Sequence, residues 1–130
     1  MSARPPDRGR RGRGERGAVT AELAMTLPLL VSLTIGLVWL LSVGAAQIRA
    51  VDAARETARA VARGDDPAAA VAAGERVAPE GGRVTISGGP PGGNVVAVAT
   101  AQVEGPGGLF GFLPAVTVHA EATALVEATP

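Results

Sequence analysis

The hydrophobic pattern is dominated by one long apolar run, which extends from Leu23 to Ile48 without a charged residue. At a rise of about 1.5 Å per residue, a helix over this run measures about 39 Å, and the hydrocarbon core of a bilayer is about 30 Å thick. The run therefore predicts a transmembrane helix. We expect this helix to begin near Ala18 or Val19.

Beyond the span, the hydrophobic pattern becomes amphipathic. Apolar positions recur at helical spacing between Gln47 and Arg63, which predicts that the helix continues out of the membrane. Asp66 and Pro67 are suited to the N-cap and the first position of a second, short helix that ends near Val77.

The period of the pattern then changes from helical to alternating. Short strands are expected at 83–87, 94–104 and 115–127, with a Gly- and Pro-rich turn at 88–93. One apolar face of this antiparallel sheet should pack on the helix, and Phe110 and Phe112 in the last loop should cover the small core. The predicted fold class is α+β: a long N-terminal transmembrane helix continuing into an amphipathic helix, a short second helix, and a small three-stranded antiparallel sheet.

The charge pattern gives the chain an orientation. Arginines crowd the segment before the span, at Arg4, Arg8, Arg10, Arg11, Arg13 and Arg16. Since basic flanks stay in the cytoplasm, we expect a single-pass protein of the cytoplasmic membrane with its C-terminal part outside. The expected organisation is a cytoplasmic Arg-rich leader (1–17), a transmembrane helix (18–48), an extracytoplasmic helical region (49–78) and a small β-rich region (79–130). Nucleic acid is not an expected partner, because the basic segment adjoins a span and lacks interleaved aromatic residues.

Three interpretations of the N-terminal segment remain open. In the first, it is a permanent membrane anchor, and the carboxylate of Glu22 at the edge of the span has no special role. In the second, it is a signal peptide cut after the small residues 44–46, which releases a domain beginning at Gln47; the apolar run is too long for such a peptide. In the third, a membrane peptidase cuts on the cytoplasmic side, and the helix stays on the mature protein.

A resemblance to a known family supports the third interpretation. Gly17 followed by Glu22, between a basic leader and an apolar helix, resembles the type IV prepilin signal, in which a Gly precedes the cut and Glu is the fifth residue after it. The segments 16–28 and 53–59 resemble TadE-like minor pilins or pseudopilins of the tight-adherence (Flp-type, type IV) pilus system. The chain departs from many prepilins in carrying a small residue, Ala18, where they have Phe, so the resemblance does not carry N-methylation over.

The resemblance implies a structural component or assembly factor of a pilus. A prepilin peptidase would cut between Gly17 and Ala18, and Glu22 would serve in recognition and axial registry between subunits. The implied partners are the prepilin peptidase, other pilin subunits, the inner-membrane assembly machinery and the membrane itself. The alternative is a single-pass membrane protein with a small extracytoplasmic interaction domain and no role in a pilus.

Residues for catalysis or metal binding are sparse. The chain has no cysteine, which excludes disulfides and thiolate metal sites. His119 and Glu121 are expected on one strand face, but they lack an evident third ligand or nucleophile. We therefore expect no enzymatic activity, no catalytic or metal-binding residues and no cofactor.

Overall fold

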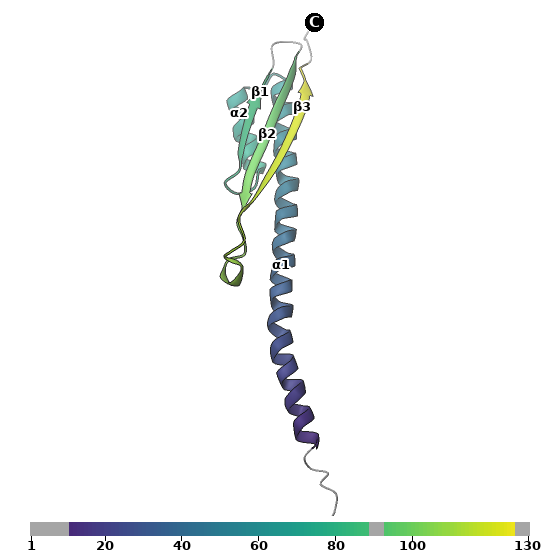
Figure 1. The fold of residues 1–130 in the computed structure, drawn as a ribbon. Coiled ribbons are helices and arrows are strands. Elements are labelled where there is room, and N and C mark those ends of the chain that lie inside the picture. Colours follow the sequence, from purple (N-terminus) through teal and green to yellow (C-terminus); the bar gives the residue numbers. More distant parts are fainter. Residues whose placement is uncertain (1–10, 89–92, 127–130) are drawn as a thin grey trace, which may run out of the picture. The chain divides into compact units, whose positions relative to one another are not determined.

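The computed structural model describes residues 11–88 and 93–126, as two α-helices, a short 3-10 helix and three strands (Figure 1). The elements are α1 (Arg11–Ala62), α2 (Pro67–Val77), β1 (Arg83–Ser87), β2 (Asn94–Val103), η1 (Gly108–Phe110) and β3 (Val116–Leu125). This layout confirms the predicted α+β fold class. The chain divides after Leu37 into two compact units, and the second, Val38–Pro130, is called the domain below.

Helix α1 begins earlier than the sequence indicated. We predicted a start near Ala18, whereas α1 begins at Arg11. The segment from Arg11 to Gly17 contains no proline that would stop the helix, so α1 continues back into the leader although the glycines of this segment favour it little. The rest of the leader, residues 1–10, lies outside the described residues.

The sheet has the order β1-β2-β3, and both pairs of strands are antiparallel. Ala99 in β2 lies opposite Val84 in β1 and Ala120 in β3, and all three are buried. The predicted strands were slightly too long, because β2 ends at Val103 and β3 covers Val116–Leu125. Of the predicted turn and strand ends, residues 89–92 and 127 lie outside the described part of the chain.

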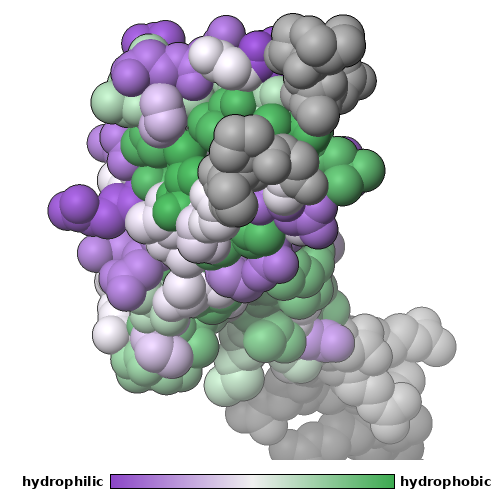
Figure 2. Space-filling model, turned by 90° about the horizontal axis from the view of Figure 1, so that it is seen from above, coloured by the Kyte–Doolittle hydropathy of each residue, from purple (hydrophilic) through white to green (hydrophobic). Residues whose placement is uncertain are grey.

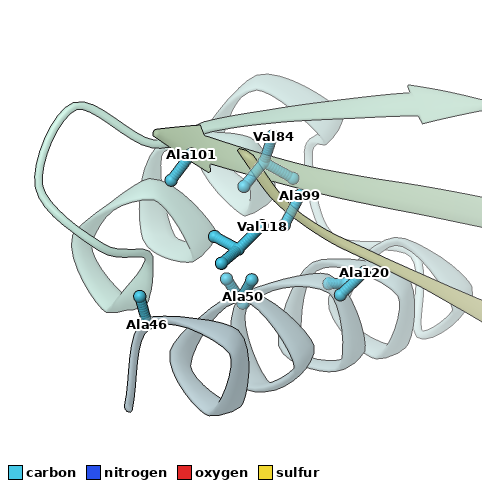
Figure 3. Close-up of a cluster of buried hydrophobic side chains, with 9 residues drawn as sticks. Ala46, Ala50, Val84, Ala99, Ala101, Val118 and Ala120 are labelled. Carbon is cyan, nitrogen blue, oxygen red and sulfur yellow. The ribbon is translucent and has the colours of Figure 1, made fainter. Parts of the chain in front are cut away.

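The core lies between α1 and the sheet, which confirms that the apolar sheet face packs on the helix. The buried cluster combines α1 with all three strands (Figure 3): Ala46, Ala50, Ala53, Ala54, Val84, Ala99, Ala101, Val118 and Ala120. Most members are alanines, so the helix can approach the sheet closely. Since an alanine buries little apolar area, each contributes less to stability than a larger side chain would.

Helix α2 begins as predicted. The carboxylate of Asp66 accepts a hydrogen bond from the main-chain N–H of Ala69 at 2.9 Å, and Pro67 occupies the first helical turn. Between the helices, Gly64 has a φ of 91°, a conformation that favours glycine. The chain can therefore end α1 and start α2 within a few residues, which places α2 beside β1 (Figure 1).

The two phenylalanines do not cover the core, so this expectation was wrong. The loop 104–115 continues past the ends of β2 and β3, and Phe112 is 78% exposed. The ring centroids of Phe110 and Phe112 are 6.5 Å apart. The alanine and valine side chains already fill the space between α1 and the sheet, so the aromatic rings remain in the loop.

Candidate functional site

The three residues singled out by the sequence all lie on α1. Gly17, Ala18 and Glu22 are exposed, and the peptide bond between Gly17 and Ala18 is inside the helix. Ala18 and Glu22 are four positions apart, so they share one helix face at an axial separation of about 6 Å. The structure therefore places the carboxylate one turn from the amine that cleavage would create.

Packing within the chain does not require glycine at position 17. A Cβ atom built on Gly17 would have no other atom within 4 Å, and the same holds for Gly14 one turn earlier. Both positions are exposed on α1. A requirement for Gly17 would therefore come from another molecule that contacts this segment.

Glu22 lies at the start of an exposed apolar surface. Its neighbours Val19, Leu23 and Met25 are 56%, 58% and 81% exposed. The hydroxyl of Thr26 donates to the main-chain carbonyl of Glu22 at 2.7 Å, which leaves the carboxylate itself uninvolved. Among the side chains that the structure describes, none forms an ion pair or a side-chain hydrogen bond with the Glu22 carboxylate. A carboxylate in this position is available to a partner outside the described chain.

The apolar residues of α1 have no cover from the rest of the described chain. The exposed large side chains are Val19, Leu23, Met25, Leu27, Leu29, Leu30, Val31, Leu33, Ile35, Leu37, Val38, Leu40 and Leu41, all at least 40% exposed. The most apolar window has a mean hydropathy of 2.2 and is 6% buried. A core helix of a water-soluble protein would be mostly buried, whereas a helix that is apolar all round suits a bilayer.

The surface of the domain has a different character. Seen from above in Figure 2, it combines hydrophilic and hydrophobic residues. Charged side chains on this surface pair with one another: Glu56 accepts from Arg59 at 3.3 Å, and Asp65 accepts from Arg63 at 3.4 Å. Such a surface is suited to water, in contrast to the apolar part of α1.

Within the domain, helix α1 also has polar contacts with β3 and with the segment after β2 that the sequence did not indicate. The indole N–H of Trp39 donates to the main-chain carbonyl of Glu104 at 2.8 Å. Two turns further along, the Gln47 side-chain amide donates to the carbonyl of His119 at 2.8 Å. No local sequence signal predicts such contacts, because the acceptors are main-chain atoms.

An open groove of about 850 Å³ lies between α1, the segment 79–83 and the ends of β2 and β3. Its charged residues have mixed signs: Arg49, Arg83, Glu80 and Glu104. His119 and Glu121 are exposed on the outer face of β3. No group of three His, Asp or Glu side chains within the described ranges could hold a metal ion.

Comparison with known families gives one result. The family model described as TadE-like protein matches residues 17–59. No curated protein and no solved structure matches the chain. The match begins at Gly17 and ends within the last turn of α1, before α2 and the sheet. It confirms the resemblance inferred from the sequence for this segment.

Proposed function

Because residues 17–59 are TadE-like, we propose that this protein is a pilus-associated membrane protein of a tight-adherence system. More specifically, we propose a minor pilin or pseudopilin that is a structural component or assembly factor and has no enzymatic activity. The observation that carries the proposal is that the family match covers the exposed apolar helix and begins at Gly17.

The exposed apolar part of α1 is the proposed membrane anchor. It is long enough to cross a bilayer, and its large side chains face outward on all sides. The arginines before it favour a cytoplasmic N-terminus and an extracytoplasmic domain. This location gives the N-terminal segment access to a membrane peptidase and the domain access to other subunits.

The proposed processing site is the peptide bond between Gly17 and Ala18. This bond lies within α1, and proteases bind their substrates in extended conformations, so the first turns of α1 must unwind before cleavage. Gly12, Gly14 and Gly17 weaken the helix there by about 0.5–1 kcal/mol each relative to alanine. The glycines therefore lower the free energy that is needed to unwind the helix locally.

Glu22 is the proposed registry residue. Cleavage would free the amine of Ala18, which carries a positive charge and lies one turn away from the carboxylate along the helix. In a bundle of such helices, the amine of one subunit could pair with Glu22 of a neighbour. A buried charge that loses its partner costs about 3–5 kcal/mol. Only the axial alignment of the helices that pairs both charges would therefore be stable.

The N-terminal sequence of the protein recovered from membranes of its host tests the proposal. A start at Ala18 supports prepilin-type processing, and an intact leader contradicts it. The variant Gly17→Val should block processing, whereas Gly14→Val should be processed normally. The two positions are matched, because both are exposed and have open space around the missing side chain.

Two other interpretations predict different N-termini. A plain single-pass anchor without a pilus role retains the leader, and the exposed helix fits it equally well. A secreted domain would begin at Gln47. The structure gives a specific argument against secretion: that cut would remove Ala46, which is 7% exposed in the core, and Trp39, which is bonded to Glu104.

A further inference from the structure

The loop between β2 and β3 has an unusual composition for an exposed segment. From Gly105 to Val118 the sequence contains no charged residue. Phe112 is 78% exposed, and its ring lies 6.5 Å from that of Phe110. An exposed apolar loop of this kind indicates a contact with another apolar phase or surface.

The base of this loop is attached to the apolar part of α1. The bond from Trp39 to the Glu104 carbonyl holds the end of β2 at that level of the helix. Leu40 and Leu41, the next two residues of α1, are 59% and 73% exposed. The loop therefore leaves the sheet at the end of the domain where the apolar surface of α1 is uncovered.

We propose that the aromatic loop, residues 105–115, inserts Phe110 and Phe112 into the outer interface of the lipid bilayer. The proposal rests on the proposed membrane insertion of α1. A lipid surface is the favoured occupant because the base of the loop is bonded to Trp39, and the adjacent exposed residues Leu40 and Leu41 themselves require an apolar phase at this level. Aromatic rings are favoured at the interface, and the loop carries no charge that would have to be desolvated.

The length of the apolar run agrees with a position of the loop at the outer interface of the bilayer. A span of about 20 residues is enough for the hydrocarbon core, so a helix that enters at Leu23 leaves it near Ser42. The remaining apolar residues up to Ile48 extend about 9 Å into the interfacial layer. Trp39 and the base of the aromatic loop are thus located at the outer boundary of the hydrocarbon core.

The consequence is a second point of attachment for the domain. A single helix lets a domain rotate and tilt above the membrane, whereas a helix and a loop together fix one side of the domain toward the lipid. The sheet would then present a defined face to neighbouring proteins.

Site-specific labelling of the full chain tests the proposal, since the natural sequence has no cysteine. Phe112→Cys, Thr123→Cys and Leu33→Cys each receive a polarity-sensitive fluorophore, and the protein is reconstituted into vesicles of phosphatidylethanolamine and phosphatidylglycerol. Quenching is measured with lipids that carry a nitroxide near the top of the acyl chain and, separately, with iodide in water. Phe112 and Thr123 are both exposed, so neither change disturbs the core.

We expect the ratio of lipid to iodide quenching to be several-fold higher at position 112 than at position 123. Position 33 reports the span itself. If position 112 behaves like 123 while 33 is quenched by lipid, the loop lies in water and the inference is wrong, although the membrane anchor stands. If 112 is shielded from both quenchers, the loop packs on protein, such as a second copy, and the lipid contact is wrong. If 33 is reached by iodide, the membrane anchor and the loop contact both fail.

Discussion

The side chain of Trp39 is bonded to the main-chain carbonyl of Glu104, at an N–O distance of 2.8 Å. This bond connects the apolar part of α1 to the end of β2, 65 residues later in the chain. It means that the domain does not begin where the apolar run ends. The last turns of the apolar helix already belong to the folded unit, which starts at Val38.

Trp39→Phe should loosen the base of the aromatic loop. The variant retains an aromatic ring but loses the N–H donor. Because a single neutral hydrogen bond is lost, the free energy of unfolding should fall by about 0.5–1.5 kcal/mol. Hydrogen exchange of peptides that cover 104–114 should become faster. Gln47→Leu is the matched control, because it removes the bond from α1 to the His119 carbonyl in β3 and should affect exchange near His119 instead. Equal exchange of 104–114 in both variants would contradict the local role of Trp39.

Gly74 of α2 packs against Thr57 of α1. The buried Thr57 hydroxyl donates to the carbonyl of Ala53 at 2.9 Å, and a Cβ atom at position 74 would overlap this hydroxyl. Gly74→Ala should therefore lower the free energy of unfolding by about 1–3 kcal/mol. Denaturant titration can be followed by the fluorescence of Trp39, which is the only tryptophan and is bonded to Glu104 within the domain.

A double-mutant cycle separates this overlap from a general effect of alanine. Thr57→Ala removes the hydroxyl, so it should cost less in the Gly74→Ala background than in the natural chain. Gly44→Ala is a control for helix propensity, because Gly44 has open space around the missing side chain. It should leave stability unchanged or raise it by up to about 1 kcal/mol. A cycle without coupling would show that the two helices adjust their spacing.

Asp66→Ala should destabilise the start of α2. The variant loses the carboxylate that accepts the N–H of Ala69, and such N-cap losses cost about 0.5–2 kcal/mol. Asp65→Ala removes a neighbouring carboxylate that instead contacts the Arg63 side chain at 3.4 Å on the surface. Exposed ion pairs contribute little, so this control should be nearly neutral. The amide of Ala69 should exchange faster in the first variant only, and equal effects would contradict the cap assignment.

An element could be predicted from the sequence where the residues that determine it are neighbours in the chain. Asp66 and Pro67 are adjacent and together mark the start of α2, so the sequence was sufficient to predict it. The alternation of apolar and polar residues in β3 likewise predicted its buried face. The contact of Thr57 with Gly74 and that of Trp39 with Glu104 join residues far apart in the chain, and no pattern in either segment specifies the partner. The phenylalanines were misplaced because hydrophobicity alone does not distinguish a core residue from one directed at another surface. The roles of Gly17, Ala18 and Glu22 stay predictions, and the structure shows only that the three residues lie exposed on α1, as their spacing in the sequence indicated.

Glu22→Gln should separate registry from membrane insertion. Glutamine has nearly the same size and helix propensity, so the exposed helix should form and insert as before. The proposed amine of the neighbouring subunit would lose its anionic partner, and a loss of about 1.4 kcal/mol already lowers incorporation tenfold. The measurement is the fraction of mature protein found in sheared pili relative to the membrane. Glu121→Gln is the control, because this carboxylate is exposed on the outer face of β3. If both variants enter pili as well as the natural protein does, Glu22 does not set the register, and the exposed carboxylate at the edge of the span needs another explanation.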